Sequence, residues 1–108
     1  MSLYAEYIKE RLDLEIIELE HGYATYKFIP EGCYIEDIYV RPDFRRTHLA
    51  TELADQIASI AKARGCTKLF GTVAPNTRGA TSSLKTLLGY GMTLLNSSPQ
   101  LIVFSKDI

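Results

Sequence analysis

The decisive stretch of this chain is Val40-Arg41-Pro42-Asp43-Phe44-Arg45-Arg46-Thr47-His48-Leu49-Ala50, which leads from an extended apolar run through a proline turn into an amphipathic helix. Free backbone N–H groups and the positive end of the helix dipole attract anions at such a junction. Arg45 and Arg46 add guanidinium groups whose planar fork suits phosphate oxygens. The junction therefore predicts a phosphate cradle at the start of the helix.

The helix expected after this loop, over residues 47–64, carries a clear periodic signal. Its apolar side chains recur at helical spacing and form one stripe, made of Leu49, Leu53, Ile57 and Ile60. Gly65 is placed to end the helix at the C′ position. Residues 68–74 are a predicted strand, and a right-handed crossover through the helix makes it parallel to the strand expected over residues 33–40.

The remaining elements complete one α/β domain over residues 1–108. A short helix is expected over residues 2–11, followed by strands over 13–20 and 23–29 joined at His21-Gly22. A second helix over residues 79–88 precedes a closing hairpin of residues 92–95 and 101–105. The sequence thus predicts a mixed, mostly antiparallel sheet of six strands (α+β in character) with a central parallel pair and flanking helices.

The strand over residues 33–40 has an irregular apolar pattern. Ile35 is at an odd position, whereas Ile38 and Val40 are at even positions, although a regular strand keeps one parity on one face. A β-bulge near Glu36 and Asp37 would shift the phase by one residue. A strand buried on both faces is the alternative explanation.

Composition and length limit the classes of protein. With 108 residues, 46% hydrophobic and 23% charged, the chain fits one globular domain. No apolar run approaches the roughly 20 residues of a membrane helix, and no signal peptide is recognised, so we expect a cytoplasmic protein without membrane contact. Cys33 and Cys66 are expected to be buried free thiols, and His21 and His48 are too isolated for a metal site.

The net charge of −1 is unevenly distributed. Residues 1–31 hold seven acidic and three basic residues, a balance of −4, and residues 41–85 hold eight basic and three acidic residues, a balance of +5. The acidic end favours a cationic partner and the basic middle an anionic one. Solvated faces that segregate by chance explain the same pattern.

Together these residues resemble the GNAT superfamily of acyl-CoA-dependent N-acetyltransferases. The family pattern Val-x-Pro-x-x-Arg/Gln-x-x-Gly-x-Gly/Ala is similar to Val40-x-Pro42-x-x-Arg45-x-x-His48-x-Ala50. Residues 83–92 look like the family's second helix, which ends in Leu-x-x-Gly-Phe, and the resemblance covers about residues 13–108. The form of the family that this chain resembles is short and phage-like, with a variant pyrophosphate loop. It implies acetyl transfer from acetyl-CoA to a primary amine of a small molecule, a lysine or an N-terminus by direct attack, without a metal.

The resemblance implies a CoA site made of three parts. Loop N–H groups bind the pyrophosphate, backbone between the diverging parallel strands pairs with the pantetheine amides, and a strand N–H polarises the thioester carbonyl. The CoA-binding residues expected on this basis are Ile38, Tyr39, Val40, Arg45, Arg46, Thr47, His48, Leu49, Ala50, Asn76 and Ser83.

Glu36 and Asp37 are the predicted bases for the amine, because many family members recruit a carboxylate at about this depth of the strand. The alternative is that both side chains face solvent. The family often uses a tyrosine on the second helix to reprotonate the thiolate, but no tyrosine holds that position here. Tyr90 is the predicted catalytic acid, with Ser82, Ser83 or solvent as other choices.

Several tyrosines are expected to line an acceptor pocket or to pack, half-buried, on the sheet. They are Tyr4, Tyr7, Tyr23, Tyr26, Tyr34 and Tyr39. Only residues 2–11 roof the acceptor side, which predicts an open site or one completed by a second copy in a homodimer.

His48 departs from the family pattern at the first glycine of the loop. Histidine tolerates the left-handed conformation, so the turn is expected to survive with weaker cofactor binding. One alternative function is therefore a catalytically degenerate domain that binds CoA or a protein partner. A nucleic-acid binder is disfavoured by the overall acidity and the lack of interleaved basic and aromatic residues.

Overall fold

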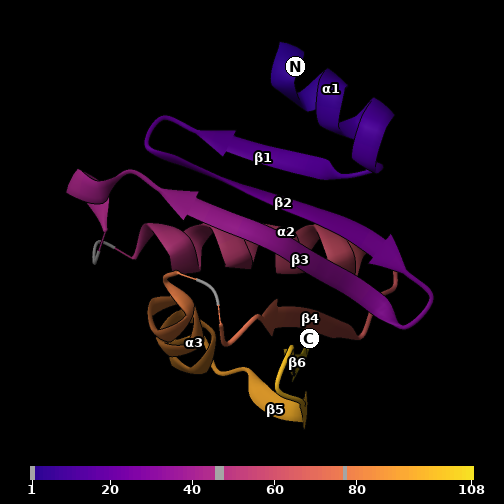
Figure 1. Cartoon of the computed structure of the whole chain (residues 1–108). Helices are drawn as coiled ribbons and strands as arrows, with labels where there is room; N and C mark the ends of the chain where they lie inside the picture. The colour runs from indigo at the N-terminus through magenta and orange to yellow at the C-terminus, as the bar shows by residue number, and fades with distance from the viewer. Residues whose placement is uncertain (1, 46–47, 77) are drawn as a thin grey trace.

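The chain folds around one mixed sheet, shown in Figure 1 as a computed structural model that describes residues 2–45, 48–76 and 78–108. The helices are α1 (Leu3–Leu12), α2 (Leu49–Ala63) and α3 (Ala80–Gly89), with a short 3-10 helix, η1 (Pro42–Phe44), before α2. The strands are β1 (Glu15–Leu19), β2 (Gly22–Ile29), β3 (Gly32–Val40), β4 (Lys68–Val73), β5 (Thr93–Ser97) and β6 (Ile102–Asp107). The strand order β1-β2-β3-β4-β6-β5, with β3 and β4 parallel and the other neighbours antiparallel, confirms the predicted fold class.

β3 contains the predicted bulge. Its register on β2 pairs Asp37 with Thr25 and Ile35 with Tyr26, which leaves Glu36 as the extra residue. The bulge shifts the phase of the strand by one residue, so the apolar side chains before and after it face the same helix. Of the two explanations for the irregular apolar pattern in the sequence, the β-bulge is therefore the correct one.

β3 and β4 diverge directly after a short paired region. Their parallel register runs from Cys33 opposite Leu69 to Ile35 opposite Gly71. Beyond this point β3 continues to Val40 on β2, and β4 continues on β6. The bulge therefore lies where the two parallel strands separate.

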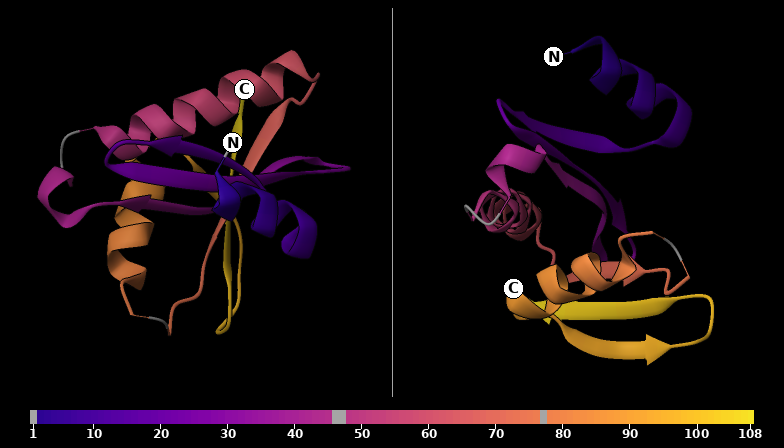
Figure 2. Two further views of the ribbon diagram at one scale, coloured as in Figure 1. Left: turned by 90° about the horizontal axis from the view of Figure 1, so that it is seen from above. Right: turned by 60° about the vertical axis from the view of Figure 1, so that its left-hand side comes forward.

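Helices cover the two faces of the sheet unequally. Leu53 and Ile57 of α2 pack in one core cluster with Leu69 of β4 and Ala24 of β2. Leu87 of α3 lies over Gly71 of β4, which points to the same face as Leu69. The next residue of β2, Thr25, is 4% exposed and points to the other face, where α1 packs. Figure 2 shows α1 and α2 on opposite sides of the sheet.

The two ends of α2 have left-handed residues. His48 precedes the helix with φ 65° and ψ 9°. Gly65 follows it with φ 89°, and its N–H donates to the carbonyl of Lys62. This confirms Gly65 as the residue that ends the helix.

Both cysteines are free, as predicted, but only Cys33 is buried. Burial raises the pKa of the Cys33 thiol to about 11. Cys66 is half-buried in the segment that joins α2 to β4. The expectation of two buried thiols was therefore wrong for Cys66.

Within the described ranges no helix has the length and apolar character needed to cross a bilayer. α2, for example, has 15 residues, which is short of the roughly 20 that a transmembrane helix requires.

Candidate functional site

The divergence of β3 and β4 creates a site lined by backbone. Each strand keeps one hydrogen-bonded neighbour, β2 for β3 and β6 for β4. The facing edges of residues 36–40 and 72–73 lie beyond the β3–β4 register, which ends at Ile35 and Gly71. Such edges offer N–H and C=O groups to an extended, amide-bearing ligand. Ile38, Tyr39 and Val40, which were predicted to bind CoA, lie on this edge.

The predicted phosphate cradle lies at the start of α2. His48 is exposed and holds the left-handed conformation that the sequence predicted, and Leu49 and Ala50 begin the helix half-buried. The carbonyl of His48 accepts the first helical hydrogen bond, from the N–H of Glu52 at 2.9 Å. The N–H groups in the first turn of an α-helix have no carbonyl one turn earlier to pair with, so they lack partners within the helix. Arg46 and Thr47, two further predicted contacts, lie outside the described residues.

Arg45 braces the loop as well as adding charge to it. Its Nε donates to the carbonyl oxygen of Val40 at 3.0 Å, and its guanidinium carbon lies 5.8 Å from the ring centroid of Tyr39. The side chain thereby ties the residue that follows η1 to the end of β3. A direct fork onto phosphate was the expectation, but part of the guanidinium is already occupied.

His21 is a residue of this site that the sequence did not reveal. Its ring stacks on Phe44 of η1 with centroids 3.5 Å apart and planes 6° apart. Its carbonyl accepts the N–H of Arg41 at 2.8 Å. The β1–β2 turn therefore fixes the segment that leads into the cradle. A histidine next to glycine in a turn gives no local signal for a contact with residues 41–44.

The two predicted bases lie at the divergence of the strands. Glu36, the extra residue of the bulge, and Asp37 are both exposed. Asp37 points to the face that α1 covers in part, beside Tyr23. Burial raises the pKa of Tyr23, and the nearby charge of Asp37 contributes to this shift.

Tyr90 lies elsewhere, between α2 and β6. Its hydroxyl donates to Oδ1 of Asp55 at 2.8 Å, and its carbonyl accepts from Nζ of Lys106 at 2.9 Å. Burial is the main cause that raises the pKa of Tyr90 above its usual range, and the hydrogen bond to Asp55 adds to it. These contacts give Tyr90 a packing partner on each side and do not connect it to the strand edges.

The other two predicted contacts also belong to the α3 side. The Asn76 amide donates to the carbonyl of Pro99 at 3.3 Å, which ties the β4–α3 loop to the β5–β6 hairpin. The side chain of Ser83, in α3, lies outside the described part of the structure.

An open depression of about 730 Å³ follows the outer side of α2 from His48 to Ile60. Glu52 and Asp55 are among the residues that line it. Their carboxylates repel a polyphosphate, so only the end at His48 belongs to the cradle. Among the described residues no group of three His, Cys, Asp or Glu side chains is placed to hold a metal ion.

A model of the acetyltransferase (GNAT) family matches residues 21–90, more than half of the chain. The chain belongs to this family. This GNAT chain is 31% identical over 71 residues to the thialysine N-epsilon-acetyltransferase of Sus scrofa, covering 61% of this chain and 42% of that protein. Similar proteins of Bos taurus and Mus musculus are covered to 27% and 31%, so the chain spans less than half the length of these curated relatives.

Solved structures of the GNAT fold agree with this assignment. The PaiA N-acetyltransferase of Thermoplasma acidophilum, in complex with coenzyme A, superposes with a TM-score of 0.76 at 14% identity, covering 95% of this chain and 67% of that one. A protein described as a streptothricin acetyltransferase of Bacillus anthracis, in complex with acetyl coenzyme A, gives 0.75 at 18% identity and covers 88% and 62%. At these identities the likeness establishes the fold. The phage-like character of this GNAT domain stays a prediction.

Proposed function

We propose that this chain transfers an acetyl group from acetyl-CoA to a primary amine by direct attack. The observation that carries the proposal is the divergence of β3 from β4, whose β3 edge ends at Val40 near the start of α2. Leu49 of α2 lies close to Gly22, the partner of Val40 on β2. This arrangement would join an anion site to an exposed strand edge, in a chain whose residues 21–90 match the GNAT family. In acetyl-CoA the pyrophosphate is likewise joined to an amide-bearing arm.

The residues present fit this cosubstrate. The backbone N–H groups of residues 48–50 would hold the pyrophosphate at the positive end of α2, with the charge of Arg45 nearby. The edge formed by Ile38, Tyr39 and Val40 would pair with the pantetheine amides. Acetyl-CoA supplies an activated acyl group as a thioester.

The chain's own contribution is to orient the amine and to remove its proton. The amine nitrogen forms a bond to the thioester carbon, the carbon–sulfur bond breaks, and the electron pair leaves with sulfur. A strand N–H near Tyr39 or Val40 would stabilise the charge on the carbonyl oxygen, a type of contact worth about 2.7–4 kcal/mol. Glu36 or Asp37 would accept the amine proton, because both carboxylates are exposed at the divergence.

The proton for the thiolate does not need a dedicated residue. A thiol with a pKa of about 8.5 is a fair leaving group near neutral pH. The catalytic role predicted for Tyr90 stays a prediction, and its hydrogen bond to Asp55 argues against it. The acceptor could be a small molecule, a lysine or an N-terminus. Three other expectations also stay predictions: that the protein is cytoplasmic, that it has no nucleic-acid partner and that it forms a homodimer.

The second candidate function is a degenerate domain that binds CoA or a protein partner without turnover. Its supporting observation is His48, because a side chain at this position stands where the family pattern has glycine. Thermal-shift measurements and calorimetry with acetyl-CoA and CoA, followed by a thiol-release assay over a panel of amines, separate the two. Binding and thiol release together support the transferase, and binding without release supports the degenerate domain. If neither acetyl-CoA nor CoA binds, the result contradicts the transferase and the CoA-binding form of the degenerate domain.

A further inference from the structure

Three tyrosines from three elements form a continuous wall on the sheet face that α1 partly covers. Tyr23 of β2 lies opposite Tyr39 of β3, with ring centroids 5.7 Å apart. Tyr4 of α1 meets Tyr23 edge-on at 6.0 Å. Tyr4 and Tyr39 remain 45% and 41% exposed, so the wall faces solvent. We call these three residues the tyrosine wall.

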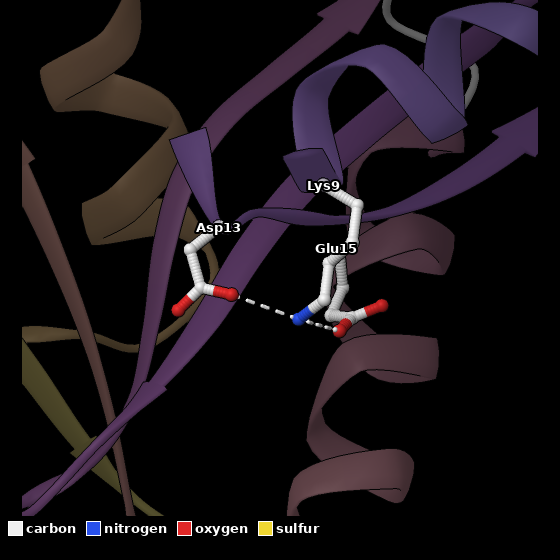
Figure 3. Close-up of polar contacts among 3 residues, drawn as sticks. All are labelled: Lys9, Asp13 and Glu15. Carbon is white, nitrogen blue, oxygen red and sulfur yellow. Dashed lines mark hydrogen bonds and ion pairs between the residues drawn. The ribbon is translucent and has the colours of Figure 1, made fainter. Parts of the chain in front are cut away.

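α1 is held so that Tyr4 stays on this wall. At its start, the hydroxyl of Ser2 caps the N–H of Ala5 and donates to Glu18 of β1 at 2.7 Å. At its end, Nζ of Lys9 lies 2.9 Å from Asp13 and 2.7 Å from Glu15 of β1. Figure 3 shows Lys9 between the two carboxylates. Each contact is exposed and weak by itself. Contacts at both ends of a ten-residue helix fix its direction along β1.

A carboxylate completes the wall on the side of the divergent strands. Asp37 is two residues before Tyr39 on β3, so both side chains project from the same face. The pKa of Tyr23 is raised mainly by burial, and the charges of Tyr4 and Asp37 raise it further. On the same face, the hydroxyls of Tyr34 and Thr72 are 2.7 Å apart across β3 and β4, at the start of the divergence.

We propose that the tyrosine wall and Asp37 select an acceptor that carries a second positive charge, that is, a diamine or polyamine cation. This inference rests on the proposed transferase function. Aromatic faces and a carboxylate attract an ammonium group. The net negative charge of residues 1–31 also attracts a cationic acceptor. In this arrangement Asp37 holds the distal ammonium, and Glu36 is left to accept the proton of the attacking amine.

Arg45 is the one described cation in contact with the wall, at 5.8 Å from the ring of Tyr39. Its Nε is directed to the carbonyl of Val40, and the bound pyrophosphate would neutralise its charge. The wall therefore keeps its attraction for a cation at Tyr4, Tyr23 and Asp37, away from Arg45.

The test compares 1,4-diaminobutane with n-butylamine as acceptors in a thiol-release assay. The quantity measured is the ratio of the two kcat/KM values, because the intrinsic reactivity of each amine is the same for every variant. Tyr23→Leu and Asp37→Asn should each lower this ratio about fivefold, the loss expected for one cation–π or charge contact. Tyr23→Phe keeps the ring and its packing and should retain most of the ratio.

The matched control is Tyr7→Leu. Tyr7 lies on the same helix and is 54% exposed, with Arg11 and not the wall against its ring, so its loss should leave the ratio unchanged. A ratio that stays constant in folded Tyr23→Leu and Asp37→Asn overturns the inference while the transferase function stands. If acetyl-CoA binds without turnover, the same ratio is taken from dissociation constants of the two amines with CoA present. No acetyl-CoA binding and no turnover overturns both.

Discussion

Replacing His48 with glycine tests the phosphate cradle at the residue on which it most depends. His48 is exposed at φ 65°, and the left-handed conformation costs a residue with a Cβ atom about 1–2 kcal/mol. Glycine avoids that cost but loses about 0.5–1 kcal/mol more chain entropy on folding. The net gain of about 0.5–1 kcal/mol should raise Tm by about 2–8 °C. His48→Ala keeps the strain and should not gain stability.

The same substitution should tighten acetyl-CoA binding. Without the ring, phosphate can approach the N–H groups of the first turn of α2, and one additional charge-assisted hydrogen bond is worth about 1.5–3 kcal/mol. The dissociation constant from calorimetry should therefore fall about tenfold or more. An affinity that stays flat or falls would refute the view that His48 weakens the cradle.

Gly65→Ala is the matched control for backbone strain. Gly65 lies at the other end of α2 with φ 89°, and a Cβ atom there meets nothing within 4 Å. The substitution should lower Tm, because alanine pays the left-handed cost that glycine avoids. Acetyl-CoA affinity should not change. A parallel loss of affinity would show that the calorimetric signal follows global stability and not the cradle.

Three more predictions address the other parts of the site. Glu36→Gln should lower kcat by about 10²–10⁴-fold without changing acetyl-CoA affinity, because it removes the proton acceptor; a wild-type rate would assign that role elsewhere. Tyr90→Phe should leave kcat unchanged. Burial and Asp55 raise the pKa of Tyr90, so its neutral hydroxyl stabilises the fold below about pH 10, and this contribution is lost as the pH rises further. Denaturant unfolding should therefore show that Tyr90→Phe loses less stability in alkali than the unchanged protein. Gly22→Ala should destabilise the fold by about 1–3 kcal/mol and weaken acetyl-CoA binding, because its Cβ would lie 2.6 Å from the carbonyl oxygen of Tyr39; unchanged thermal unfolding would show that β2 and β3 move apart freely.

The sequence by itself determined the local elements. The stripe of α2, the stop at Gly65 and the left-handed residue at His48 are all set within a few residues of chain. The phase slip between Ile35 and Ile38 was enough to predict the bulge. Backbone preference and burial periodicity act over short windows, so a short window of sequence records them.

Only the tertiary structure decided which side chains meet. The sheet order places β6 between β4 and β5, against their order in the chain. The contacts of His21 with Phe44, Tyr90 with Asp55 and Tyr4 with Tyr23 join residues 19 to 35 positions apart. Exposed polar and aromatic side chains carry no periodic signal for their partners, because solvent satisfies them equally well in most arrangements. The tyrosine wall exists because the sheet and α1 bring these residues together.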